Sequence, residues 1–112
     1  MRRVVVTGMG IVSSLGNNTE AVTTSLKQAK SGICFSPEYA DLGFRSQVYA
    51  MPDIDIDAYV DRRAMRFHGR GTAWNHIAMD QAVADSGLSA EEVSNIRTGI
   101  VMAVSYTHLT LP

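Results

Sequence analysis

Three arginines within five positions are the residues of this sequence best suited to binding chemistry: Arg62, Arg63 and Arg66. Asp61 can cap a helix that begins at Arg62. On that helix Arg62 and Arg66 share one face because they lie four residues apart, and Arg63 lies beside them. Three guanidinium groups on one exposed surface suit a partner that carries phosphate or carboxylate groups. Composition alone favours a simpler interpretation, a solvated helix face on which Asp61 pairs locally.

A nucleotide site is the second candidate, because glycines follow the first apolar run of the chain. Gly8 and Gly10 match the first two glycines of the dinucleotide fingerprint, but Ser13 takes the place of the third. A phosphate loop also needs a lysine after its last glycine, and none follows Gly16. The preferred role of these glycines is therefore a tight backbone turn beside a strand.

Two sets of possible metal ligands lack the residues that would complete them. Asp53, Asp55 and Asp57 are spaced like the start of a calcium loop, without the glycine and the glutamate that such a loop requires. His76 and Asp80 lie four residues apart, but no further ligand is evident. A surface pair is expected at these two positions, and neither a metal nor a cofactor is expected in the chain.

Composition places the chain among ordinary globular proteins of one small domain. It has 112 residues, 46% of them hydrophobic, and a net charge of -1. Without a basic excess, neither nucleic acid nor a membrane is expected as a partner. The chain has no apolar run long enough to span a bilayer and no signal-peptide pattern. Its single cysteine, Cys34, fits a reducing cytoplasm and is expected to be a small buried side chain rather than a nucleophile.

Strands and helices must position these residues. The β-branched run at residues 4–7 does not alternate with polar residues, so it predicts a strand covered on both faces, and residues 98–103 predict another. Residues 42–50 alternate, which predicts a strand with one wetter face. Because so short a chain offers few partner strands, apolar faces are expected to remain in water.

Three helices are predicted from apolar spacing and capping residues. Residues 19–30 carry an amphipathic pattern, and residues 68–86 predict the longest helix, with a kink or restart near Thr72. Ser89 and Glu92 form a capping-box pattern that opens a short helix to about Asn95.

Five segments, in this order and spacing, resemble the N-terminal quarter of a β-ketoacyl-acyl-carrier-protein synthase, the condensing enzyme of bacterial fatty-acid synthesis, and most closely its type I branch. They are residues 4–16, 30–35, 44–46, 61–67 and 81–89. The resemblance implies an α/β fold, the five-layered α-β-α-β-α thiolase fold built from two similar halves, of which this chain would hold an incomplete sheet. It also implies a homodimer.

The same resemblance implies decarboxylative condensation as the chemistry of the complete enzyme. An acyl group on a cysteine is attacked by malonyl-carrier protein as it loses carbon dioxide, which needs an activated thiolate and donors that stabilise the developing charge. The family's cysteine, two histidines and lysine lie beyond the end of this chain. Cys34, His68 and His76 do not match those positions, so the chain itself is expected to be inactive.

For Arg62, Arg63 and Arg66, the resemblance implies a role in binding acyl-carrier protein. These residues match a basic patch that meets the acidic carrier protein in type I enzymes, which reverses the preference for a solvated face. The alternative is a small non-enzymatic α/β module that binds a nucleotide or an acidic protein partner.

The last nine residues depart from the family pattern. The family continues from the strand at residues 98–103 into a glycine- and serine-rich turn, whereas this chain reads VSYTHLTLP. That segment looks like the translation of a transposon-derived sequencing adapter. The sequence therefore predicts residues 1–103 as the N-terminal part of a β-ketoacyl synthase N-terminal domain and residues 104–112 as a non-native tail.

Overall fold

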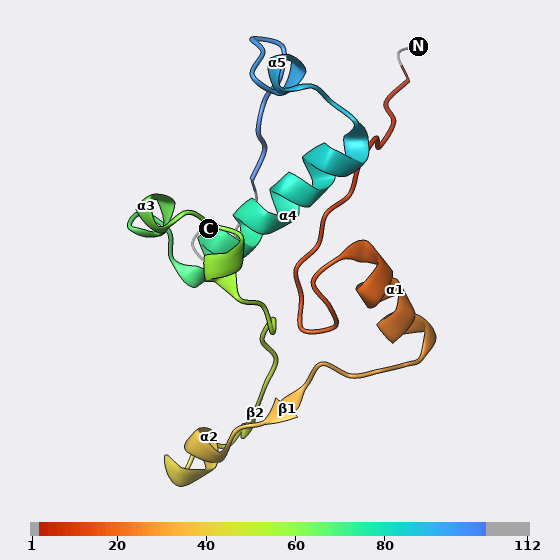
Figure 1. Ribbon diagram of the computed structural model, residues 1–112. Coiled ribbons are helices and arrows are strands. Elements are labelled where there is room, and N and C mark those ends of the chain that lie inside the picture. Colours follow the sequence, from red (N-terminus) through yellow and green to blue (C-terminus); the bar gives the residue numbers. More distant parts are fainter. Residues whose placement is uncertain (1–2, 103–112) are drawn as a thin grey trace, which may run out of the picture.

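The computed structural model describes residues 3–102 of the chain. Its elements follow in the order α1 (Thr19–Lys27), β1 (Cys34–Phe35), α2 (Pro37–Asp41), β2 (Val48–Tyr49), the 3-10 helix η1 (Ile56–Ala58), α3 (Arg62–Met65), α4 (Arg70–Ser86) and α5 (Ala90–Val93). Helix α4 lies at the centre of the arrangement, with the N-terminal segment passing beside it and α3 close to its first turn (Figure 1). The neighbours of α4 therefore decide where the candidate residues lie.

The predicted restart near Thr72 is confirmed in kind: α3 ends at Met65, and α4 starts at Arg70, slightly earlier than predicted. Gly69 is its N-cap and contributes no side-chain hydrogen bond, because glycine has no side chain to offer. The helix ends where Gly87 takes a left-handed conformation with φ 69°, and the Gly87 amide donates to the carbonyl of Ala84. A glycine at this position ends a helix without steric cost.

The N-terminal segment is held against α4 by hydrogen bonds between backbone and side chains. The Met9 amide donates to the Asp85 carboxylate at 2.9 Å, and the Ile11 amide donates to Gln81 Oε1 at 3.1 Å. Gln81 Nε2 in turn donates to the carbonyl of Asn17 at 2.7 Å. Met9 and Ile11 thus bind α4 about one turn apart, and residues 11–17 fold back so that both of their ends reach the Gln81 side chain.

The two predicted buried strands are wrong within the described residues. Residues 4–7 and 98–102 belong to no strand, and Val4 is 95% exposed. The only sheet in residues 3–102 joins β1 to β2 antiparallel, with Cys34 opposite Tyr49 and Phe35 opposite Val48. An apolar extended run becomes a strand only when another strand supplies its hydrogen bonds, and this part of the chain supplies none. The last residue of the second prediction, Ala103, lies outside the described residues.

The alternating segment at residues 42–50 forms a strand only at its end. Leu42 and Gly43 complete the turn after α2, and Val48 and Tyr49 alone pair with β1. Residues 3–102 thus combine helices with a two-stranded antiparallel sheet and do not form the five layers of the predicted fold. They match the expectation of an incomplete sheet that leaves apolar side chains in water.

A small core fixes α3 onto α4. Val60, Ala73 and Ile77 are buried together, and Ala64 and Met65 of α3 pack against them. The core thus joins the loop before α3, the inner face of α3 and the first half of α4. This packing determines which side of α3 faces solvent.

Helix α1 ends earlier than the sequence predicted. The predicted helix extended to Lys30, but the observed helix stops at Lys27 and Ala29 takes a positive φ of 52°. The Lys30 amide then donates to the carbonyl of Ser25 at 2.9 Å. A left-handed residue closes the last turn in the way that glycine usually does.

The predicted capping box of α5 is confirmed, although the helix stops at Val93. The Ser89 amide donates to Glu92 Oε2 at 2.9 Å, and the Glu92 amide donates to Ser89 Oγ at 3.3 Å. The hydrogen bond from the Ser89 backbone, followed by that from its hydroxyl, lowers the pKa of Glu92 below its ordinary value of 4.5.

This lowered pKa predicts a pH-dependent cap. A carboxyl group whose pKa falls on folding stabilises the folded state at pH values above the unfolded pKa, and the stabilisation is lost as pH falls through the folded pKa. We therefore expect the Ser89 amide resonance to shift in an NMR titration with a midpoint below pH 4.5. Glu92→Gln removes this transition, and a midpoint at or above 4.5 contradicts the assignment.

Candidate functional site

Helix α3 begins as the sequence predicted, with Asp61 as its N-cap. The Arg63 amide donates to Asp61 Oδ1 at 3.3 Å, and the four-residue helix runs from Arg62 to Met65. Arg66 is the C-cap residue, and its amide donates to the carbonyl of Arg63 at 3.4 Å. Local hydrogen bonds thus place all three arginines within about one helical turn of each other.

The three guanidinium groups are exposed and unneutralised. Val60 is buried and Ala64 and Met65 pack on the core, so Arg62, Arg63 and Arg66 face solvent. Within residues 3–102, no ion pair joins any of them to a carboxylate. Because the Asp61 carboxylate accepts a backbone hydrogen bond instead, the interpretation in which Asp61 pairs with these arginines is not supported.

This surface, defined by Arg62, Arg63 and Arg66 and called the α3 basic surface below, can attract an acidic partner. Guanidinium groups bind carboxylates in a two-pronged geometry and remain charged at any physiological pH. The absence of local ion pairs in the described residues leaves their positive potential directed to solvent. The surface can therefore hold and orient a partner, and it carries no nucleophile or general base of its own.

The glycines of the nucleotide hypothesis serve close packing instead. A Cβ added at Gly10 would lie 2.8 Å from the Ala82 amide nitrogen and closer still to the carbonyl oxygen of Ala78. A Cβ at Gly8 would lie 2.6 Å from the Ser86 amide nitrogen. These contacts are with the C-terminal half of α4, whose dipole disfavours anions. A fingerprint glycine would instead place phosphate at a helix N-terminus, so the geometry argues against nucleotide binding here.

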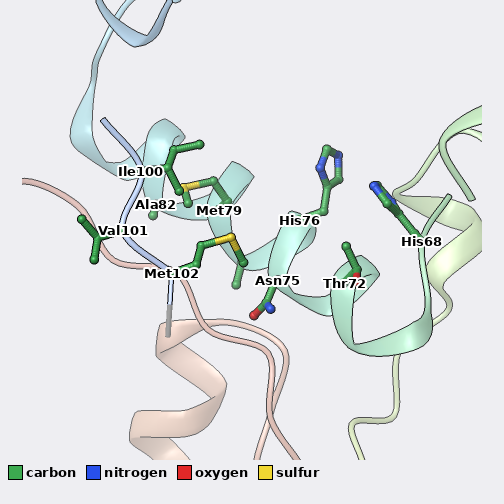
Figure 2. Close-up of a pocket in the computed structure, with 11 residues that line it drawn as sticks. His68, Thr72, Asn75, His76, Met79, Ala82, Ile100, Val101 and Met102 are labelled. Carbon is green, nitrogen blue, oxygen red and sulfur yellow. The ribbon is translucent and has the colours of Figure 1, made fainter. Parts of the chain in front are cut away.

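The predicted surface pair of His76 and Asp80 is confirmed, with 3.4 Å between Nε2 and Oδ2. The ring of His68, which sequence reasoning did not connect with this pair, has its centroid 5.7 Å from that of His76. Both histidines line a groove of about 470 Å³ along α4, and Met79, Ile100 and Met102 line its other end (Figure 2). In the part of the chain that the structure describes, no group of three or more possible ligands is arranged to hold a metal ion.

The three aspartates do not form a calcium loop. The Asp57 amide donates to Asp55 Oδ1 at 3.2 Å, which starts the 3-10 helix η1 instead. Asp53, Asp55 and Asp57 line a second groove together with Arg70 and Trp74. All three residues are exposed, and the Asp55 carboxylate caps η1.

The prediction that Cys34 is buried is wrong, because its side chain is exposed. It lies on β1, and the two-stranded sheet has no covering layer over it in the described residues. The Cys34 sulfur donates a long hydrogen bond, 4.0 Å from Sγ to the carbonyl oxygen of Gly32. A nucleophilic cysteine needs a neighbouring base, and among residues 3–102 no hydrogen bond joins the Cys34 sulfur to one.

Among residues 3–102, no helix has both the length and the apolar character needed to cross a bilayer.

Comparison with known proteins gives consistent matches along most of the chain. The family model described as "Beta-ketoacyl synthase, N-terminal domain" matches residues 1–110. The chain is 44% identical over 102 residues to 3-oxoacyl-[acyl-carrier-protein] synthase 1 of Haemophilus influenzae, covering 91% of this chain and 25% of that protein. The synthase 1 of Escherichia coli K12 is 43% identical over 102 residues, covering 90% of this chain and 25% of the relative. The synthase 2 of Vibrio harveyi is 31% identical over 102 residues, again with 90% of this chain and 25% of the relative covered. The chain thus spans about a quarter of the length of these curated relatives.

Proposed function

This chain belongs to the β-ketoacyl synthase family, as its sequence predicted, and from that premise we propose that it is the N-terminal portion of a condensing enzyme of fatty-acid synthesis. The observation that carries the proposal is the family match over residues 1–110. Its relatives at 44% and 43% identity are both named 3-oxoacyl-[acyl-carrier-protein] synthase 1, and each is about four times as long as the part matched here.

The proposed reaction of the complete protein is decarboxylative condensation. An acyl group is held as a thioester on a cysteine, and the malonyl group on the carrier protein loses carbon dioxide to give a carbanion. The carbanion attacks the thioester carbonyl, so that a carbon–carbon bond forms, the carbon–sulfur bond breaks and the thiolate leaves. This chemistry needs an activated thiolate and hydrogen-bond donors at the developing oxyanion.

The reactive groups belong, in this proposal, to the part of the parent enzyme that follows this chain. Supporting this, Cys34 is exposed and its Sγ bonds only to a backbone carbonyl among the described residues. His68 and His76 lie against one another along α4 rather than beside a cysteine (Figure 2). The 112-residue chain is accordingly proposed to be an acyltransferase by family and inactive by itself.

The contribution of this chain is proposed to be docking of the acyl-carrier protein. Arg62, Arg63 and Arg66 are exposed, lie on a helix anchored to the core, and form no ion pair within residues 3–102. A surface of this kind increases the association rate of an acidic partner and fixes its orientation. The relatives are named for the 3-oxoacyl group that they build on acyl-carrier protein, which supports this partner.

Other features follow from family membership and are proposals here. They are the five-layered thiolase fold of the complete protein, a homodimer and a cytoplasmic location. We also assign residues 1–103 to the N-terminal part of the synthase domain and residues 104–112 to a non-native tail, which lies outside the described residues. The family match extends to residue 110, so the coding DNA decides this boundary.

One experiment tests the enzymatic proposal. The source DNA is sequenced beyond the codon for residue 103, and the resulting product is assayed beside the 112-residue chain. Mass spectrometry of the carrier protein detects the 3-oxoacyl product from acyl and malonyl thioesters. We expect the longer product to contain a cysteine and two histidines and to condense, and the short chain to give no product.

Two outcomes contradict this. Condensation by the short chain would show that its own residues suffice. A source sequence that ends directly after Pro112, combined with carrier-protein binding by the short chain, would favour the non-enzymatic interaction module instead.

A further inference from the structure

Phe67 is an exposed aromatic side chain at the edge of the α3 basic surface. It is 88% exposed and directly follows Arg66, the C-cap residue of α3. Its amide donates to the carbonyl of Ala64 at 3.0 Å, which fixes its backbone in the turn that closes the helix. Because Ala64 packs on the core, the position of Phe67 is anchored to α4 rather than free in a loop.

The surroundings of Phe67 distinguish it from other exposed apolar residues of this chain. Val4 and Val101 are even more exposed than Phe67, but each stands within an apolar run, where another extended segment is the natural neighbour. Phe67 instead follows three arginines within six positions. Aromatic residues and arginine are the types most enriched in binding hot spots, where the aromatic group is buried and the charges surround it.

We propose that Phe67 is the apolar anchor of the α3 basic surface, and that the partner presents an apolar side chain or shallow pocket bordered by carboxylates. This deepens the docking role and rests on the proposed function, which supplies an acidic carrier protein as the occupant. Charge complementarity selects an acidic partner because the three guanidinium groups lack ion pairs in the described residues. The net charge of -1 makes nucleic acid the less favoured occupant.

The test is a binding titration of fluorescently labelled holo-acyl-carrier protein with the 112-residue chain, read by anisotropy at several salt concentrations. Phe67→Ser is expected to weaken binding about tenfold, since an aromatic group that is buried on binding is lost. The slope of log Kd against log salt is expected to stay unchanged because no charge is removed. Phe67→Leu, which keeps an apolar group, is expected to lose less than about threefold.

Ile96→Ser is the matched control. Ile96 is 100% exposed and apolar, and it follows α5, which Figure 1 places away from α3. Its replacement is expected to leave Kd unchanged. Far-UV circular dichroism of each variant checks that helix content is preserved, as expected for side chains outside the core.

The outcomes distinguish the anchor role of Phe67 from the docking role of the α3 basic surface. If Phe67→Ser binds like the unaltered chain while reversal of the Arg62 and Arg66 charges abolishes binding, the anchor is wrong and the docking role stands. If neither change has an effect, or the unaltered chain does not bind, the docking role also fails. A third outcome would overturn the choice of an acidic protein as the partner. In it, an oligothymidylate displaces the carrier protein, and Phe67→Ser weakens the binding of that oligothymidylate.

Discussion

Arg62→Glu combined with Arg66→Glu is expected to weaken binding of acyl-carrier protein by about a hundredfold at low ionic strength. Each reversal replaces an attraction with a repulsion, and a factor of about ten for each site corresponds to about 1.4 kcal/mol. Both side chains are exposed and form no ion pair within residues 3–102, so their charges act on the partner rather than on this chain. The measurement is the anisotropy titration, repeated with added salt, which should weaken the unaltered complex.

The control for this double variant is Lys30→Glu combined with Arg97→Glu. Both residues are exposed and lie away from α3 in the sequence. Their two substitutions change the net charge of the chain by the same amount as Arg62→Glu combined with Arg66→Glu. If the control weakens binding as strongly, the effect is one of total charge and the α3 basic surface has no special role. Salt-independent binding would contradict the electrostatic argument as well.

Gly10→Ala is expected to destabilise the folded chain by about 3 kcal/mol or more. The new Cβ would lie 2.8 Å from the Ala82 amide nitrogen and nearer still to the carbonyl oxygen of Ala78, and backbone atoms inside a helix cannot move aside. The N-terminal segment would have to lift from α4. It would then lose the hydrogen bonds from the Ile11 amide to Gln81 and from Gln81 to the Asn17 carbonyl.

Thermal unfolding followed by circular dichroism measures this loss, with Gly71→Ala as the matched control. Gly71 lies in the first turn of α4, and an added Cβ there meets nothing within 4 Å. Since alanine favours a helix more than glycine does, Gly71→Ala is expected to raise stability by about 0.5 kcal/mol. If Gly10→Ala unfolds at the same temperature as the unaltered chain, the N-terminal segment does not pack against α4 as described.

The α3 basic surface was predictable in part. The spacing of Arg62, Arg63 and Arg66 and the cap at Asp61 are local features, and both were found from sequence. The sequence did not predict that these arginines form no ion pair within the described residues, because this depends on where the Asp61 carboxylate points. The anchor role proposed for Phe67 was not predicted, although the sequence shows an aromatic residue directly after a basic cluster.

The sequence by itself determined the N-caps of α3 and α5, because a cap depends on hydrogen bonds between residues a few positions apart. Asp61 and the pair Ser89 and Glu92 act as predicted, and the longest helix ends at Ser86, the last residue of its predicted range. Family membership was likewise predicted correctly, since it rests on the order and spacing of residues rather than on contacts.

Only the tertiary structure decided which extended segments pair and which side chains are covered. Residues 4–7 have the composition of a buried strand, yet among residues 3–102 no neighbouring strand supplies their hydrogen bonds. Cys34 is exposed for the same reason, because no layer covers β1 in that part of the chain. The role of Gly10 depended on α4, more than sixty residues away in the sequence. Burial and pairing are properties of two segments together, so the pattern of one segment can predict its tendency but not its outcome.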